Sequence, residues 1–145
     1  MIYNLKNQWD VPKFKDYVKK LIEQQAIVEV KKRNPNRTIS QNKYLHLILG
    51  WFACEYGCSI EEAKIDFYKR ECNKELFVKT RFNKAGKEVP YLQSTTLLTT
   101  SEMTLSIERF RNWSSSVAGI YLPSPREDQL LIYVEQEIER NKEYL

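Results

Sequence analysis

The segment of residues 38–56 constrains the fold of this chain more than any other stretch. Thr38 and Gln41 have the spacing of a capping box, in which the threonine hydroxyl accepts a first-turn N–H and the glutamine side chain returns to the cap. Apolar side chains then recur at helical spacing from Leu45 to Tyr56. The pattern predicts a buried helix from about Ile39 to about Tyr56.

Polar donors gather at the start of this predicted helix. Gln41 and Asn42 supply amides there, at the end of a helix where free N–H groups and the helix dipole favour an anion. Basic residues without an intervening acid lead into it: Lys31, Lys32, Arg33, Arg37 and Lys43. Tyr44 and His46 follow directly. Because single-stranded nucleic acid is held by basic grooves and aromatic faces, this run predicts a nucleic-acid contact.

A second basic cluster lies on a predicted hairpin. Residues 75–83 alternate between apolar and polar side chains, a turn follows, and residues 88–96 return as a second strand. Pro90 cannot donate to a ladder, so this second strand is expected at an edge or a bulge. The hairpin carries three further candidate nucleic-acid contacts, which are Arg81, Lys84 and Lys87.

The remaining patterns complete a single α+β domain over residues 1–145. Residues 1–6 and 26–31 are predicted as strands, and a helix capped by Asp10 stands between them. Ser59 with Glu62, and Thr99 with Glu102, have capping-box spacing and start two more helices, the second ending near residue 118. A last helix is predicted from about residue 125 to about residue 142. We expect about five helices packed with a small sheet made of the N-terminal strands and the hairpin.

Composition supports a self-contained protein. A chain of 145 residues with 42% hydrophobic residues can bury its own core. Three cysteines, an odd number, argue against a secreted disulfide framework. The N-terminus lacks the pattern of a signal peptide, and the longest apolar run, residues 45–54, is too short to span a membrane. We therefore expect a cytoplasmic protein without a membrane partner.

Catalytic and metal-binding patterns are weak. His46 is the only histidine, and the four glycines form no phosphate-binding loop. The cysteines lack the paired spacing of a structural zinc site. We expect no catalytic residue, no metal site and no cofactor. An alternative is a metal-dependent nuclease or resolvase that uses Asp66 and nearby acids, which are Glu61, Glu62 and Glu71.

Charge is unevenly distributed along the chain. The net charge is +4, yet the last twenty residues hold six acids against three bases. A basic body suits contact with nucleic acid, and the acidic last helix then faces solvent or a protein. A further alternative is therefore a protein-interaction adaptor that acts through this helix.

Two motifs carry a family resemblance. Residues 36–43 read Asn-Arg-Thr-x-x-Gln-Asn-Lys and are followed by Tyr-Leu-His; a second segment reads Thr-Thr-Ser-Glu-Met at 99–103, Ile-Glu-Arg-Phe-Arg-Asn-Trp at 107–113 and Gly-Ile-Tyr-Leu-Pro-Ser-Pro at 119–125. Together they resemble the NinB family of phage recombination proteins over about residues 27–127.

The resemblance implies a non-catalytic recombination mediator. Such proteins are homodimers that bind single-stranded DNA and gapped or tailed duplexes and assist recombinase loading in the bacterial host cytoplasm. A single-strand-binding protein or a recombination exonuclease is the implied protein partner. Arg37, Gln41, Asn42 and Lys43 match the family motif. His46 stands where the best-known member has a tryptophan, so Tyr44 is a second candidate for stacking on a base.

Overall fold

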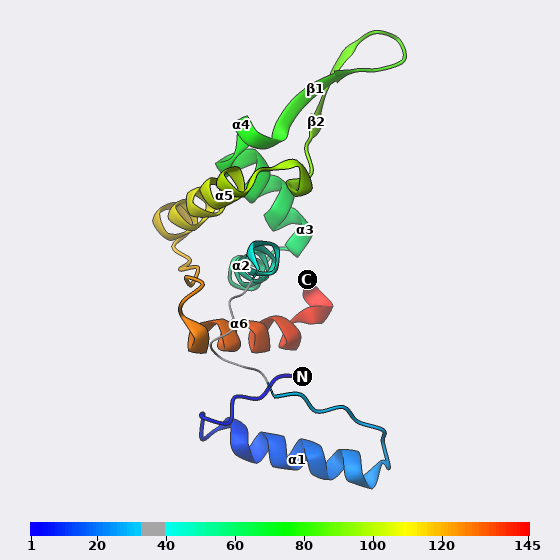
Figure 1. Ribbon diagram of the computed structural model, residues 1–145, viewed down its shortest axis with the longest axis vertical. Helices are drawn as coiled ribbons and strands as arrows, with labels where there is room; N and C mark the ends of the chain where they lie inside the picture. The colour runs from blue at the N-terminus through cyan, green and yellow to red at the C-terminus, as the bar shows by residue number, and fades with distance from the viewer. Residues whose placement is uncertain (33–39) are drawn as a thin grey trace.

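Helix α2 (Gln41–Tyr56) runs through the middle of the molecule, with most other elements arranged around it (Figure 1). The structure is a computed structural model that describes residues 1–32 and 40–145. The described residues form six α-helices and one two-stranded antiparallel sheet, so the α+β prediction is confirmed. The other helices are α1 (Asp10–Glu23), α3 (Ile60–Glu62), α4 (Lys74–Phe77), α5 (Thr100–Trp113) and α6 (Asp128–Arg140).

The core forms along one side of α2. The helix buries seven residues, which are Tyr44, Leu45, Ile48, Leu49, Gly50, Phe52 and Ala53. Phe52 lies at the centre, with its ring 5.3 Å from the ring of Phe110 on α5 and 5.3 Å from that of Phe67. Gly57 ends the helix in the left-handed conformation at φ 89°, one residue beyond the predicted end near Tyr56.

A π-helical stretch, Ala63–Cys72, continues α3, and the spacing of its buried residues differs from that of an α-helix. Ala63, Tyr68 and Asn73 are all fully buried and lie five residues apart. This period matches the i→i+5 bonding of a π-helix rather than the 3.6-residue period of an α-helix. The sequence correctly places a helix here behind the Ser59 cap.

Helix α5 begins with the predicted capping box. The Thr99 hydroxyl accepts the Glu102 N–H, and the Glu102 carboxylate accepts the Thr99 N–H at 2.9 Å. A short π-helical turn, Ser114–Ala118, extends α5, and Gly119 closes it at φ 70°. Both predicted ends of this helix are confirmed.

Helix α6 packs against α2 at a position where α2 has no side chain. A Cβ placed on Gly50 would lie 2.7 Å from Cδ1 of Ile138, closer than carbon atoms can approach. A side chain here would require the end of the Ile138 side chain to move, so glycine favours close helix contact. The helix begins at Asp128, with Glu127 as N-cap, and not at Pro125 as predicted, because residues 125–126 form a turn first.

The sheet is the predicted hairpin. Strands β1 (Val78–Phe82) and β2 (Glu88–Leu92) pair antiparallel, with Val78 opposite Leu92 and Phe82 opposite Glu88. The first strand starts later than predicted because Lys74–Phe77 form α4. The hairpin projects from one end of the molecule, and α1 lies at the other end (Figure 1).

The two predicted N-terminal strands are wrong. Residues 1–6 make no ladder, because the Asn4 N–H donates instead to the Asp10 carboxylate at 2.9 Å. Residues 26–31 run extended, but the only sheet among the described residues is the hairpin. Asp10 lies inside the first turn of α1 and does not cap it.

None of the helices in the described ranges has the length and apolar character needed to cross a bilayer.

Candidate nucleic-acid interface

The N-terminal end of α2 is fixed by two polar contacts. Ser40 is the N-cap, and its hydroxyl accepts the Lys43 N–H at 3.3 Å. The Gln41 side chain donates from Nε2 to the Thr104 hydroxyl of α5 at 2.7 Å. The predicted start near Ile39 is therefore wrong by two residues, and Gln41 ties α2 to α5. The predicted cap, Thr38, lies outside the described residues.

The first two turns of α2 expose most of the predicted contact residues. The side chains of Gln41, Asn42, Lys43 and His46 are all exposed. His46 therefore lies on the surface and is not packed in the core. One helix end thus combines amides, an ammonium group and an imidazole with the positive end of the helix dipole, which is an arrangement that can hold an anion.

Tyr44 is the member of the predicted site that the structure contradicts. Its side chain is only 3% exposed, and its hydroxyl donates to the Pro123 carbonyl. Burial raises the pKa of this phenol to about 12. A ring enclosed in this way has no face for a nucleobase, so Tyr44 is a core residue that links α2 to the segment before α6.

The basic run before α2 is described only in part. Lys31 and Lys32 are exposed in the extended segment after α1. The Lys31 ammonium lies 3.1 Å from the Glu29 carboxylate, and both side chains are mostly exposed, so this ion pair contributes little. Arg33 and Arg37 lie outside the described residues.

The hairpin exposes its predicted contacts. Arg81, Lys84 and Lys87 are all exposed. The Arg81 guanidinium lies over the Tyr91 ring, 5.5 Å from its centroid, on the face that Lys79 shares. Phe77, by contrast, is fully buried at the foot of the hairpin and takes no part in this surface.

The predicted residues do not form one patch. The hairpin stands at one end of the molecule, the segment that carries Lys31 lies near the other, and α2 lies between them (Figure 1). A single strand that reached all three would have to run along the molecule. The compact element of the site is the exposed end of α2.

A group that the sequence does not reveal anchors the hairpin. The Lys69 side chain is 8% exposed and donates from Nζ to the Gln93 carbonyl at 2.9 Å, directly after β2. Its ammonium lies 5.2 Å from the Phe77 ring centroid. Burial lowers the pKa of Lys69. No local pattern marks this lysine as buried, because its partner lies 24 residues further along the chain.

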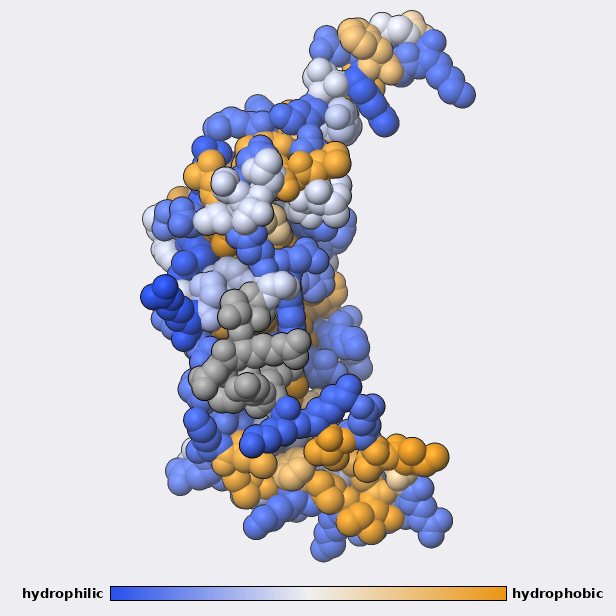
Figure 2. Space-filling model, in the orientation of Figure 1, coloured by the Kyte–Doolittle hydropathy of each residue, from blue (hydrophilic) through white to orange (hydrophobic). Residues whose placement is uncertain are grey.

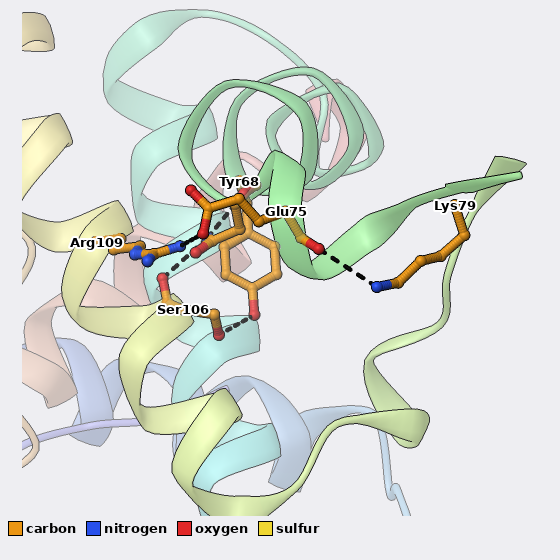
Figure 3. Close-up of polar contacts among 6 residues, drawn as sticks. Tyr68, Glu75, Lys79, Ser106 and Arg109 are labelled. Atoms are coloured by element: carbon orange, nitrogen blue, oxygen red, sulfur yellow. Dashed lines mark hydrogen bonds and ion pairs between the residues drawn. The ribbon is translucent and has the colours of Figure 1, made fainter. Parts of the chain in front are cut away.

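A second set of contacts braces the same foot. Figure 3 shows the Arg109 guanidinium reaching Glu75 and the Lys79 ammonium reaching the same residue. The first contact spans 3.3 Å to the Glu75 carboxylate, and the second spans 3.4 Å to its backbone carbonyl. Behind them the Tyr68 and Ser106 hydroxyls are 2.6 Å apart in the core. Arg109, part of the second family-like motif, is therefore paired with Glu75 in this structure.

Groups suited to metal or nucleophilic chemistry do not converge in the described part of the chain. There, no three acids, cysteines or histidines come close enough to hold a metal ion. Asp66, the acid proposed for a nuclease, lies 3.8 Å from Arg70 in an exposed pair. The three cysteines are free thiols, and burial raises the pKa of Cys72 to about 12. Such a thiol is protonated at neutral pH and is a poor nucleophile.

The end of the molecule opposite the hairpin is apolar. Figure 2 shows hydrophobic residues gathered over the part that carries α1. The exposed members there are Met1, Leu5, Trp9, Ile22, Ile27, Val28 and Val30. The Tyr3 ring packs against α1, with its centroid 5.4 Å from that of the Phe14 ring. An exposed apolar surface of this kind is typical of a protein interface.

No protein-family model, curated protein sequence or solved structure matches the chain.

Proposed function

We propose that this chain is a single-stranded DNA-binding accessory protein of phage or prophage recombination, similar to the NinB family and without catalytic activity. The observation that carries the proposal is the division within α2. Its first two turns expose Gln41, Asn42, Lys43 and His46, while the rest of the helix is anchored in the core. Donor groups on a rigid helix end are well placed to hold a phosphate backbone.

Each exposed group has a distinct role in this proposal. Lys43 neutralises a phosphate, and the Asn42 amide bonds a phosphate, sugar or base edge. Gln41, already held by Thr104, sets the position of the helix end. His46 is the group that stacks on a base, because Tyr44 is buried. An imidazole covers less of a base than an indole does, so the contact is a weak one.

The cellular setting of the proposal comes from the resemblance. The protein binds single strands and gapped or tailed duplexes in the bacterial host cytoplasm and assists recombinase loading. A single-strand-binding protein or a recombination exonuclease is its protein partner there.

Self-association is part of the proposal. The exposed apolar residues around α1, including Ile22, Ile27 and Val30, would be covered in a homodimer. Burying one such side chain contributes about 1.5–3 kcal/mol. Several of them together can hold two protomers.

The direct test is the salt dependence of single-strand binding. Removing two phosphate contacts with Arg37→Ala and Lys43→Ala should lower the slope of log K against log salt by about 1.4, because each contact on a single strand contributes about 0.7. The control pair, Lys19→Ala and Lys20→Ala, removes the same charge from α1. Fluorescence anisotropy with a labelled oligonucleotide gives both slopes.

Three outcomes would count against the proposal. An unchanged slope in the Arg37/Lys43 variant would remove the site assignment. Cleavage of the labelled DNA with Mg²⁺ would favour the nuclease. Absence of DNA affinity even at low salt would favour the adaptor, which acts through the acids of α6.

A further inference from the structure

The hairpin has no side packed on the body of the protein beyond its foot. Every residue from Thr80 to Glu88 is exposed, on both faces of the two strands. A lone two-stranded ribbon is marginally stable in water. A ribbon of this kind, carried outside the core, points to a ligand that binds it.

The foot of the ribbon is nevertheless rigid. The Gln93 N–H donates to the Phe77 carbonyl at 2.7 Å, and the Gln93 carbonyl accepts the Lys69 ammonium at 2.9 Å. Lys79 adds its contact to the Glu75 carbonyl at the start of β1 (Figure 3). The body therefore fixes the direction in which the ribbon projects.

The turn at the tip is also ordered by its own hydrogen bonds. The Asn83 side-chain oxygen accepts the N–H groups of Ala85 and Lys87, at 3.0 Å and 2.9 Å. Gly86 supplies the left-handed residue of the turn at φ 76°. The side chains beside this turn are thus presented on a preformed frame.

The two faces of the ribbon differ in chemistry. The alternation of the strands places Lys79, Arg81 and Tyr91 on one face, and Lys84 and Lys87 stand at the turn. Residues 78–92 hold four bases and one acid, Glu88. This surface suits a polyanion, since each cation can neutralise a phosphate.

Phe82 occupies the other face, next to the turn. Its side chain is 74% exposed. Glu88 lies opposite it in the ladder, and the cations lie on the other face and at the turn. An apolar ring that is exposed in this way has no packing role within this chain. In proteins that bind DNA with ribbons or wedges, such a ring inserts between bases or stacks on an exposed base pair.

We propose that the hairpin tip docks on duplex DNA at the point where double strand gives way to single strand. The cations contact phosphates on both sides of the groove, and Phe82 stacks on the terminal base pair. A two-stranded ribbon fits the major groove, which is about 12 Å wide. The terminal pair already exposes one face, so stacking there avoids the cost of unstacking an internal step. The inference rests on the proposed function, since the single strand beyond the junction is held by α2.

The test compares two DNAs with the protein and three of its variants. One DNA is a duplex with a single-stranded tail and the other is the tail strand alone, each with 2-aminopurine at the junction position. Phe82→Ala removes the ring, and Phe82→Trp keeps it. Leu97→Ala is the matched control, because Leu97 is 69% exposed and lies outside the hairpin.

The Phe82 ring should affect binding of the tailed duplex but not binding of the single strand. We expect the tailed duplex to bind more tightly than the single strand and to change 2-aminopurine fluorescence. Phe82→Ala should weaken tailed-duplex binding roughly 5- to 160-fold, the range for one stacked base, and abolish the fluorescence change. Single-strand affinity should stay the same, and Phe82→Trp and Leu97→Ala should behave as the unaltered protein.

The outcomes separate this inference from the proposed function. Equal binding of both DNAs, or an unaltered junction preference in Phe82→Ala, would overturn the junction contact and leave single-strand binding standing. Failure of the unaltered, folded protein to bind either DNA would overturn the proposed function as well. A change in sedimentation of Phe82→Ala would identify the ring as part of an interface between copies, and it too would overturn the inference.

Discussion

The two ends of the molecule are built alike and carry opposite chemistry. At one end a basic ribbon stands on the body, and at the other end exposed apolar residues gather around α1, a helix that also carries four lysines (Figures 1 and 2). Each is tied down through one buried charge. Lys69 holds the ribbon by the Gln93 carbonyl, and Asp10 holds the N-terminus by accepting from the Asn4 N–H and from the Gln136 amide at 2.7 Å.

This difference separates two tasks. The ribbon offers cations to a polyanion, whereas the α1 end offers apolar surface to a protein. The shared device is a charged group with satisfied hydrogen bonds, which fixes an appendage without a large core beneath it. Substitutions at one end should therefore affect DNA binding and at the other end association, with little crossover.

The largest expected effect is on duplex affinity. Reversing three charges with Arg81→Glu, Lys84→Glu and Lys87→Glu should weaken tailed-duplex binding roughly 100-fold or more near 0.1 M salt. The salt slope should fall by about 2.7, because each phosphate contact on a duplex contributes about 0.9. The matched set on α1 is Lys15→Glu, Lys19→Glu and Lys20→Glu. Equal losses in both sets would mean that net charge alone governs binding.

The next effect is on self-association. Ile27→Glu with Val30→Glu should raise the dissociation constant of the homodimer at least 10-fold, because a charge cannot be buried there unpaired. Sedimentation velocity over a range of concentrations measures it. Val117→Glu serves as control, since Val117 is equally apolar and 69% exposed but distant from α1 in the chain. A dimer that persists in the Ile27/Val30 variant would place the interface elsewhere.

A smaller effect should appear at the foot of the ribbon. Lys69→Met keeps the apolar stem but removes the bond to the Gln93 carbonyl. Charged hydrogen bonds contribute about 1.5–3 kcal/mol, offset in part by the cost of burying the ammonium, so we expect local opening to become about 1 kcal/mol easier. The Gln93 N–H should then exchange with solvent roughly five times faster, while the amides of α2 do not change. Uniformly faster exchange would instead indicate global destabilisation.

The smallest effect is the pH response of the N-terminal anchor. Burial alone would raise the pKa of Asp10, but the hydrogen bonds from Asn4 and Gln136, with the charges of Lys13 and Arg140, lower it overall. The anchor therefore adds stability above the ordinary aspartate pKa and loses it as the pH falls through the lowered value. Hydrogen exchange at the Asn4 N–H should accelerate in that acid range, and Asp10→Asn should remove the pH dependence. Unchanged acid behaviour in that variant would assign the response to another carboxylate.

Short-range sequence patterns correctly predict the parts of the fold that depend on neighbouring residues. The Thr99–Glu102 capping box, the glycine ends at Gly57 and Gly119, and the hairpin turn are all correct, because each depends on residues only a few positions apart. Predictions from local patterns fail where the structure depends on residues that are distant in the chain. The N-terminal strands need a neighbouring strand, and Asn4 instead bonds to Asp10.

The candidate site divides in the same way. The sequence predicts that the first two turns of α2 are polar and exposed. Asn42, Lys43 and His46 do lie on the surface. Tyr44 differs because its partner, the Pro123 carbonyl, comes from 79 residues further along the chain. Lys69 could not be found because its partner, the Gln93 carbonyl, lies 24 residues further along the chain.

The contact between Gly50 and Ile138 sets a rule for sequences related to this one. Gln136 lies two residues before Ile138 and donates a hydrogen bond to Asp10. A shift of α6 would therefore also disturb this contact with the N-terminal segment. A side chain at position 50 would require the Ile138 side chain to move or to be smaller. We therefore expect these two positions to covary, and Ile138→Ala to act as a suppressor of Gly50→Ala.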